Sequence, residues 1–526
     1  MMSTITEVAT RNTIVSNNPA TGDILAELAC ATPEEVHDAV QRARKAQPAW
    51  QALPVAARIA VLKRFQRTLS EQREQLATLI SREAGKPTVE ALTTEVLVVL
   101  DAAEFCICNA HSFLRDEPLP HANLAMKTKR GRLVREPYGV IGIIAPWNYP
   151  FSLPATETLA ALVTGNAVVL KPSELTPLVA LELQKLLIAS GLEPNLMQVV
   201  IGAGPVGGAL LESDIDKVVF TGSVATGKRV GEAAARRLLP AVLELGGKDP
   251  MIVLEDANLE VASSGAVWAS MMNAGQTCLS VERCYVQRSV YDRFLELCRQ
   301  KIEKLRVGEG LGSEVEMGPL IHERQLQTVE TQVNDAVARG ARLLVGGRRM
   351  TELGPNFYAP TLLADVTHEM RIMCEETFGP TLPVSAFDTD DDAVRLANDS
   401  EFGLAASVWT GDRKRGEAIA ARIKAGTVMI NDAISGFGIA EAPHGGFKQS
   451  GIGRTHGKLG LAEMVQVKYV DVDLLPRMNK VWWYGYGVAF QRQMSAFIEM
   501  LFGNSLGARI KGALGSTGAL RRRNRI

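Results

Sequence analysis

GVIGIIAP at residues 139–146 is the first of six short apolar runs that alternate with helical patterns. The others are AVVL at 167–170, MQVVI at 197–201, KVVF at 217–220, AVLEL at 241–245 and MIVL at 251–254. Near-continuous apolar runs of four to eight residues are typical of parallel strands buried on both faces. A second block of this kind extends from about residue 258 to 450. The chain is therefore predicted to be an α/β protein built on buried parallel sheets.

Helices are predicted on either side of these runs. Thr32-Pro33-Glu34-Glu35 combines an N-cap, a proline at the first helical position and a glutamate three residues after the cap. Helical periodicity continues to about Gln47 and again through 55–112, with a break near Gly85-Lys86-Pro87. Residues 118–138 are polar and basic, and we expect a loop or an extended ribbon there.

Composition excludes several classes of protein. The 526 residues carry 57 Lys and Arg against 58 Asp and Glu, so the net charge of −1 gives no general reason to bind nucleic acid. The seven cysteines are odd in number and form no CxxC pair, which argues against a disulfide framework and a structural zinc site; no metal is predicted. There is no secretory signal and no apolar stretch of 18 residues, so a cytoplasmic location is expected.

Three loops after predicted strands could hold a nucleotide. GAGPVG at 202–207 matches the GxGxxG pattern, but 217–221 lacks the acidic residue expected about 20 positions on. FTGSVATGK at 220–228 opens a helix, whose free N–H groups suit a phosphate. In KPSE at 171–174, a lysine and a carboxylate at a strand end can bind ribose hydroxyls. The match at 202–207 is weak, and such a glycine-rich segment is more often a turn. Each of the other two loops could equally be an ordinary solvated turn.

Three residues suggest nucleophilic chemistry. Cys278 in GQTC could attack a carbonyl as a thiolate, and Glu244 in the apolar segment AVLEL could have a raised pKa and activate water. Asn148 in PWNYP could donate its side-chain amide to a developing oxyanion. The alternatives are that Cys278 is a small core residue and that Glu244 is held in a salt bridge. Residue types alone leave both interpretations open.

Eight motifs together resemble the aldehyde dehydrogenase superfamily and occur in that family's order. They are PWNYP (146–150), KPSE (171–174), FTGSVATG (220–227), LELGGK (243–248), GQTC (275–278), EETFGP (375–380), NDSEFGL (398–404) and PHGGFKQSGIGR (443–454). The resemblance covers residues 15 to 475. It implies two parallel-sheet α/β domains plus a small β oligomerisation arm.

The resemblance also implies a role for each site residue. Cys278 would be the nucleophile, Glu244 the base for the hydrolytic water, and Asn148 with the Cys278 N–H the oxyanion hole. The positions implied for binding NAD are Trp147, Lys171, Glu174, Gly204, Gly222, Ser223, Gly227, Glu376 and Phe378. The implied reaction oxidises an aldehyde to a carboxylic acid through a thiohemiacetal and a thioacyl-enzyme. Glu174 would repel a 2′-phosphate, so NAD is predicted over NADP.

The substrate is predicted to be a neutral aliphatic or aromatic aldehyde. Succinate-semialdehyde members of the family place an arginine eight residues after the PWN asparagine, where this chain has Thr156 next to Glu157. An anion would therefore meet no cation there, and would meet a repulsive charge. Trp268, Met271 and Met272 could line an apolar tunnel or could be ordinary core residues. A charged semialdehyde, with Arg454 as the cation, and a non-catalytic structural role are the alternatives.

The predicted domain organisation follows the family. Residues 1–117 and 139–246 would form the NAD-binding domain and 247–462 the catalytic domain. Residues 118–138 and 463–476 would form the bridging arm, which implies a homodimer or homotetramer.

Residues 477–526 form a separate basic and aromatic tail. They hold nine basic residues and one acid, a net charge of +8, and seven aromatics lie between Trp482 and Phe502. Aromatic residues flanked by Arg and Lys suit a membrane interface, so peripheral membrane contact is predicted. The alternatives are that the tail docks on the enzyme's own surface or, less in keeping with its sparse basic residues, binds nucleic acid.

Overall fold

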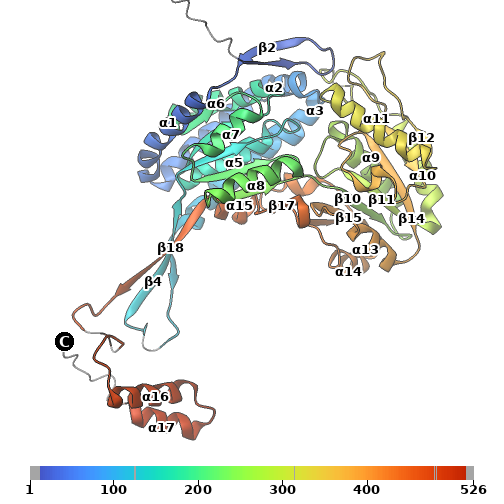
Figure 1. Ribbon diagram of the computed structural model, residues 1–526. Helices are drawn as coiled ribbons and strands as arrows, with labels where there is room; N and C mark the ends of the chain where they lie inside the picture. Colours follow the sequence, from blue (N-terminus) through green and yellow to red (C-terminus); the bar gives the residue numbers. More distant parts are fainter. Residues whose placement is uncertain (1–11, 124–125, 313, 479, 481, 517–526) are drawn as a thin grey trace, which may run out of the picture. The chain divides into compact units, whose positions relative to one another are not determined.

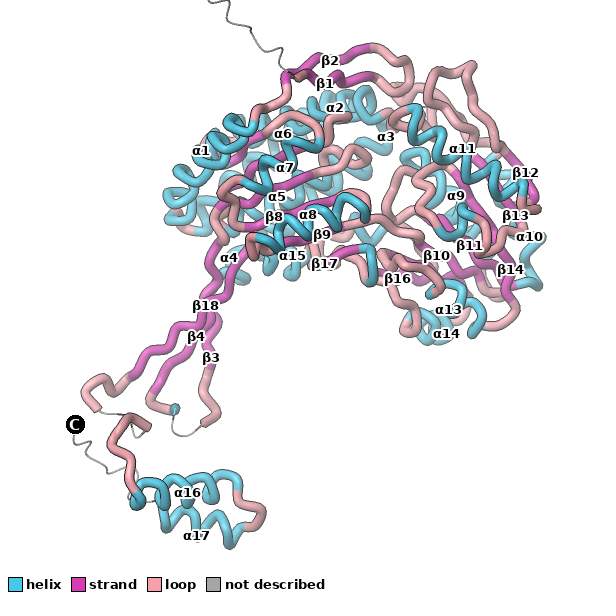
Figure 2. Tube along the Cα trace, in the orientation of Figure 1, coloured by secondary structure: helices cyan, strands magenta, loops and turns pink. Residues whose placement is uncertain are grey.

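The computed structural model describes residues 12–123, 126–312, 314–478, 480 and 482–516. Two compact units are distinguished along the chain. Residues 1–115 and 135–466 form the first unit, and residues 116–134 and 467–526 form the second. The first unit contains two α/β sheets (Figures 1 and 2).

The first sheet has six strands in the order β17-β9-β8-β5-β6-β7. All neighbouring strands are parallel except β17, which pairs antiparallel with β9. The strands are β5 (Val140–Ile144), β6 (Ala167–Lys171), β7 (Met197–Val199), β8 (Lys217–Thr221), β9 (Ala241–Glu244) and β17 (Gly451–Ile452). Residues 451–452 come from the range that the sequence assigned to the catalytic domain. Every residue of β5 and β6 is buried, as their unbroken apolar runs predict.

The second sheet has seven strands in the order β12-β13-β14-β11-β10-β15-β16, parallel except between β12 and β13. They are β10 (Asp249–Val253), β11 (Val281–Gln287), β12 (Arg342–Val345), β13 (Thr361–Ala364), β14 (Thr381–Phe387), β15 (Ala405–Trp409) and β16 (Thr427–Ile430). The chain passes from the first sheet to the second through Gly246-Gly247-Lys248, between β9 and β10. This short passage brings the two sheets together at the candidate site.

Helices pack against both sheets. Those before β17 are α1 (Pro33–Ala52), α2 (Val55–Ala84), α3 (Thr88–Glu90), η1 (Ala91–Val96), α4 (Leu97–Leu114), α5 (Ser152–Thr164), α6 (Pro177–Ala189), η3 (Pro194–Leu196), α7 (Gly204–Glu212), α8 (Val224–Arg236), α9 (Leu259–Met271), η4 (Met272–Gly275), η5 (Arg288–Val290), α10 (Tyr291–Ile302), α11 (Glu323–Ala338), α12 (Arg371–Cys374), α13 (Asp390–Asn398), α14 (Arg413–Ala420), η6 (Ser435–Gly438) and η7 (Lys448–Ser450). After β17 comes α15 (Gly457–Glu463).

The predicted helix start at Thr32 and the break near Gly85 are confirmed, whereas α1 extends to Ala52, beyond the predicted end at about Gln47. Thr32 caps α1: its hydroxyl accepts from the Glu35 N–H at 3.2 Å, and the Glu35 carboxylate accepts from the Thr32 N–H at 2.9 Å. Gly85 ends α2 in the left-handed conformation, with φ of 81°. Residues 91–96 form a π-helical turn, a distortion that often occurs at functional sites and that the periodicity did not predict.

The described residues also form two smaller sheets, of two and three strands. β1 (Thr13–Asn17) and β2 (Ile24–Ala29) form a hairpin. β3 (Glu117–Leu119), β4 (Lys129–Pro137) and β18 (Val465–Asp473) form a three-stranded sheet in the order β18-β4-β3, within the segments predicted as the arm. The tail contains α16 (Val488–Phe502) and α17 (Leu506–Ser516), which lie side by side (Figures 1 and 2).

Candidate active site

The candidate site lies where the two sheets of the first unit meet. Parallel strands of the first sheet end with their carboxyl termini on one edge, and Lys171, Thr221 and Glu244 are the last residues of β6, β8 and β9. Asn148 follows β5 on the same edge. Cys278 lies in the loop before the second sheet's strand β11, three residues before that strand begins. Residues far apart in sequence are brought together in this way.

Two cavities meet at Cys278. One, of about 250 Å³, is lined by Trp147, Asn148, Thr221, Gly222, Ser223, Glu244, Gln325, Glu376 and Phe378 together with Cys278. The other, of about 380 Å³, is mostly apolar and is lined by Thr93, Thr94, Val98, Tyr149, Trp268, Met272, Ile434, Phe437 and Ile439 together with Cys278. Leu153 also lines both cavities. Two reactants, one bound in each cavity, would therefore meet at the Cys278 side chain.

The Cys278 thiol is surrounded by apolar groups and carboxylates. Burial, followed by the charges of Asp249, Glu376 and Glu244, raises the pKa of this thiol well above its usual value. The resting group is therefore the neutral thiol, and it must lose its proton before it can attack a carbonyl.

Glu244 is a buried carboxylate placed to act as a base. Its side chain is about 5% exposed, and within the described part of the chain neither carboxylate oxygen has a hydrogen-bond partner. Its nearest basic atom is His444 Nε2, which lies 3.8 Å from Oε2, beyond hydrogen-bond distance. Burial, then the charge of Glu157, raises the pKa of Glu244 well above its usual value. A raised pKa makes the ionised carboxylate a stronger base toward a water molecule.

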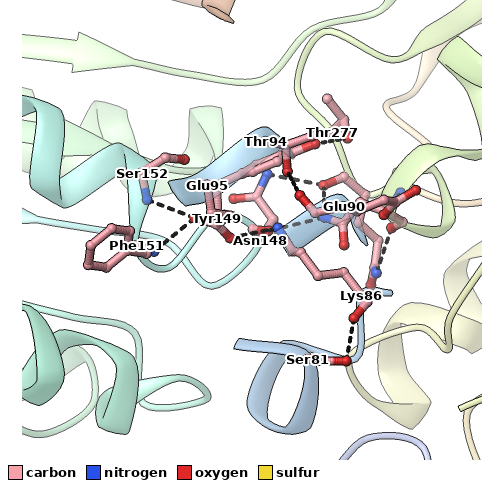
Figure 3. Close-up of polar contacts among 12 residues, drawn as sticks. Ser81, Lys86, Glu90, Thr94, Glu95, Asn148, Tyr149, Phe151, Ser152 and Thr277 are labelled. Atoms are coloured by element: carbon pink, nitrogen blue, oxygen red, sulfur yellow. Dashed lines mark hydrogen bonds and ion pairs between the residues drawn. The ribbon is translucent and has the colours of Figure 1, made fainter. Parts of the chain in front are cut away.

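The Asn148 amide is held by a buried polar network (Figure 3). Its Nδ2 donates to the Gln276 carbonyl at 3.1 Å, which leaves its second N–H for a ligand. The backbone carbonyl of Asn148 accepts from Lys86 Nζ at 2.7 Å and from Asn273 Nδ2 at 3.1 Å. Asn273 Nδ2 also donates to the Gln276 carbonyl at 3.1 Å. The segments that carry Asn148 and Cys278 are thus clamped together.

Lys86 and Glu95 form the centre of this network. Lys86 Nζ lies 2.7 Å from Glu95 Oε1, and neither side chain is exposed. The ammonium also lies 3.8 Å from the centre of the Tyr149 ring. Glu95 Oε2 accepts from the N–H groups of Phe151 and Ser152, at the start of α5. The π-helical turn η1 supplies Glu95 to the network, and its Thr93 and Thr94 line the apolar cavity.

Tyr149 links the same network to the nucleophile loop. Its hydroxyl lies 2.8 Å from Thr277 Oγ1, next to Cys278, and Figure 3 shows the two side chains pointing toward each other. Burial raises the pKa of Tyr149 well above its usual value, so the phenol is neutral. The contact therefore orients the loop and places no charge in the apolar cavity.

The residues predicted to bind the adenosine end lie at strand ends of the first sheet. Lys171 is buried and its Nζ lies 3.5 Å from Glu174 Oε2, and the Glu174 side chain is 44% exposed. Ser223 caps α8, and its hydroxyl accepts from the Thr226 N–H at 3.3 Å. A lysine, a carboxylate and the open N-terminus of a helix fit a ribose and a phosphate.

Three of the predicted glycines differ in their surroundings. Gly222 lines the smaller cavity. Gly227 does not line this cavity. A Cβ at Gly227 would lie 2.4 Å from the Leu245 side chain, so this glycine lets α8 pack closely against the residue that follows β9. Gly204 begins α7 and has open space where a Cβ would project. A role for Gly204 and Gly227 in cofactor binding stays a prediction.

Two aromatic residues and a carboxylate also line the smaller cavity. The rings of Trp147 and Phe378 pack edge to face with centroids 5.5 Å apart. Glu376 Oε1 accepts from the Gly247 N–H at 3.1 Å, and burial raises the pKa of Glu376 to about 8. Glu282 accepts from the Phe378 N–H at 2.8 Å and fixes this loop. Two aromatic rings, beside a carboxylate that can accept hydrogen bonds from hydroxyl groups, suit a cofactor that carries an aromatic ring on a ribose.

The structure corrects part of the substrate prediction. Thr156 and Glu157 line a separate small cavity with His456, so the repulsive charge expected in front of an anionic substrate is not in the apolar cavity. Trp268 and Met272 line that cavity as predicted, but Met271 lines only a neighbouring groove. Arg454 donates to the carbonyls of Gly446 and Gly453 and lines neither cavity at Cys278.

Sequence reasoning missed the residues that hold the site. The sequence marks Lys86 only as part of a helix break, and none of the eight motifs includes Glu95 or Asn273. Asn273 has a φ of 53°, in the left-handed region that asparagine tolerates, which only the structure shows. Glu95 gives a weak sequence signal, as a charge in the largely apolar segment 91–100. The partners of Lys86 are 9 and 62 residues away, and no local pattern identifies them.

The chain is similar to known proteins over most of its length. The sequence model of the aldehyde dehydrogenase family matches residues 5–470. Over 460 residues the chain is 40% identical to an Arabidopsis thaliana protein named mitochondrial succinate-semialdehyde dehydrogenase, covering 87% of this chain and 86% of that one. It is also 40% identical, over 88% of its length and 89% of the relative's, to a Mycobacterium ulcerans protein named putative succinate-semialdehyde dehydrogenase [NADP(+)] 2.

Solved structures show the same fold. An NAD+ complex of an aldehyde dehydrogenase from Bacillus cereus superposes with a TM-score of 0.84 and 37% identity, covering 88% of this chain and 94% of that one. An NADP-dependent enzyme from E. coli superposes with a TM-score of 0.85 and 36% identity, covering 88% and 95%. The predicted α/β fold is confirmed by these matches. With this fold, its eight ordered motifs and its relatives, the chain belongs to the aldehyde dehydrogenase family.

Proposed function

We propose that this enzyme oxidises neutral, apolar aldehydes to carboxylic acids with NAD and water. The observation that carries the proposal is the cavity of about 380 Å³ in front of Cys278. None of its described lining residues is charged, so an aldehyde with an apolar body would be desolvated there without leaving a charge unpaired.

The residues of the site support a two-stage reaction. Cys278 Sγ, after losing its proton, attacks the aldehyde carbon and forms a thiohemiacetal. The oxyanion accepts from the free N–H of the Asn148 amide and from the Cys278 backbone N–H. The nicotinamide cofactor, when bound in the smaller cavity, supplies the hydride acceptor. The carbon is left as a thioester on Cys278.

Glu244 completes the reaction. It takes a proton from water, the hydroxide attacks the thioester carbon, and the carbon–sulfur bond breaks. The carboxylic acid leaves and the proton returns to the Cys278 sulfur or to solvent. A carboxylate with no hydrogen-bond partner among the described residues has both oxygens available for that water.

The preference for NAD over NADP rests on Glu174. Its exposed carboxylate stands near Lys171 at the end of β6. A carboxylate at this position accepts from ribose hydroxyls and repels a 2′-phosphate. The relatives include proteins named for NADP and a structure with NAD+, so coenzyme choice is part of this proposal.

A charged semialdehyde is the second candidate, because both curated relatives described above are named succinate-semialdehyde dehydrogenases. The uncharged cavity lining favours neutral substrates instead. The test measures NADH formation with straight-chain aldehydes of increasing length, benzaldehyde and succinate semialdehyde, each with NAD and with NADP. Higher kcat/KM for the apolar aldehydes with NAD is expected. A kcat/KM that is highest for succinate semialdehyde would overturn the substrate proposal and leave the family assignment intact.

Homo-oligomerisation through the three-stranded sheet is also proposed. β18 is an edge strand that exposes apolar side chains, among them Val467, which is 62% exposed. Exposed edges pair readily with a second copy. A native mass equal to one chain would overturn this part of the proposal.

A further inference from the structure

The helical hairpin at the carboxyl terminus has an inverted distribution of side chains. The described positions that are buried in α17 are Gly512 and Ser516. Large apolar residues of the hairpin point outward instead: Phe502 is 74% exposed, Leu506 77% and Ile510 54%. A hairpin that folds for its own stability in water would place these large residues between its helices.

Small residues of α17 allow it to approach α16 closely. A Cβ on Gly512 would lie 2.3 Å from the backbone nitrogen of Met500 and 2.6 Å from the Ala496 carbonyl oxygen. A Cβ on Gly515 would lie 2.8 Å from the Ala496 Cβ. Close approach of two helices through Gly and Ala, with large apolar groups outside, is typical of helix pairs surrounded by lipid.

The outward apolar residues recur at helical spacing on both helices and define an apolar stripe on each. Leu506 and Ile510 are four residues apart and so share one face of α17. Ile498 and Phe502 have the same spacing on α16. An apolar surface of this kind on a soluble chain marks an interaction site.

The charge of the hairpin and the lengths of its helices favour the surface of an anionic lipid bilayer as its partner. The described hairpin carries three basic residues, Arg492, Arg509 and Lys511, against one acid, Glu499. The predicted membrane contact also relied on Arg521, Arg522 and Arg523, which lie outside the described residues. No described helix combines the length and apolar character needed to cross a bilayer. With 15 and 11 residues, α16 and α17 extend about 22 Å and 16 Å at roughly 1.5 Å per residue.

We propose that this hairpin inserts its outer apolar faces into one leaflet of an anionic lipid bilayer. Phe502, Leu506 and Ile510 would enter the boundary between headgroups and acyl chains. Arg509 and Lys511 would extend to the phosphates, as long basic side chains do at interfaces. Trp482 and Trp483, both exposed just before the hairpin, have the ring type favoured at the headgroup level.

Co-flotation with vesicles tests the proposal on the full-length enzyme. We expect the wild type to float with vesicles of phosphatidylcholine and phosphatidylglycerol, and to be released in part when the ionic strength is raised. Leu506→Glu with Ile510→Glu should reduce the floated fraction about tenfold or more. These side chains face outward, so the hairpin should still form and turnover of a short aldehyde should be unchanged.

Two further variants separate the effect of charge on flotation from the effect of a new glutamate outside the hairpin. Lys511→Glu alters charge alone and should weaken flotation severalfold. Ile24→Glu changes a side chain that is 70% exposed on β2, outside the hairpin, and should float like the wild type. Failure of the wild type to float with anionic vesicles would overturn the proposal, as would equal flotation of the Leu506/Ile510 double variant. A native mass that falls in that double variant, without flotation of the wild type, would assign the stripe to a second copy of the chain.

Discussion

The substitution Lys86→Met removes the ammonium group that donates to the backbone carbonyl of Asn148, the residue proposed to bind the oxyanion. In the wild type, Lys86 Nζ is 2.7 Å from both Glu95 Oε1 and the Asn148 carbonyl oxygen. The variant leaves the Glu95 carboxylate buried with two backbone N–H donors and no cation. Breaking a fully buried ion pair by removing one partner costs about 3–5 kcal/mol in the free energy of unfolding.

The loss in turnover follows from what still holds Asn148. One oxyanion donor is worth about 10²–10³ in kcat. Asn273 Nδ2 continues to donate to the Asn148 carbonyl at 3.1 Å, so the amide should be displaced and not lost. We therefore expect kcat to fall about 10- to 100-fold. NAD affinity should not change, because Lys86 does not line the smaller cavity.

Lys217→Met is the matched control. Lys217 is also buried, pairs with Glu463 at 2.6 Å and lies 5.0 Å from the centre of the Tyr138 ring. It lines neither cavity at Cys278. The assay combines urea unfolding, NAD binding and NADH formation at saturating aldehyde. If Lys86→Met loses stability as Lys217→Met does but keeps its kcat within about twofold, the positioning argument is wrong. Added Glu95→Gln should restore stability more than kcat.

Three other predictions concern the site. Cys278→Ala should abolish aldehyde oxidation, by about 10³-fold or more, and leave NAD binding intact; retained turnover in steady-state assays would remove Cys278 from the chemistry. Because burial and Glu157 raise the pKa of Glu244 and a base works only when deprotonated, kcat should increase with pH as Glu244 ionises. A kcat that falls as the pH rises would contradict that assignment. Glu174→Gln should shift the ratio of kcat/KM for NADP and NAD toward NADP by about tenfold, the order of one like-charge contact; an unchanged ratio would show that Glu174 does not select the coenzyme.

Much of the fold was readable in the sequence because its signals are local. The unbroken apolar runs at 139–146 and 167–170 became buried parallel strands, and the capping pattern at Thr32 began a helix. Cys278, Glu244 and Asn148 lie on one cavity, as the ordered motifs implied. These features depend on short segments whose side-chain pattern decides the structure.

The remaining features depend on contacts between distant segments. In the sequence Lys86 is only part of a helix break, and its hydrogen bond to the Asn148 backbone carbonyl exists only in the folded chain. Thr156 follows the PWN motif at the spacing expected for a substrate residue, yet its helix faces it toward His456 and a different cavity. In the tail, aromatic and basic composition pointed to lipid, but the Gly and Ala interface between α16 and α17 is visible only once the helices are paired.

Glu244→Gln tests most directly whether Glu244 is the base that activates water to hydrolyse a thioester on Cys278. The variant keeps the size and shape of the side chain but cannot take the proton from water. With NAD and an apolar aldehyde, we expect one NADH per active site in a rapid burst, followed by a stalled enzyme. Intact mass should then be increased by the acyl group, and that increase should be absent in Cys278→Ala. Steady NADH formation at the wild-type rate, with no acylated protein, would contradict the account.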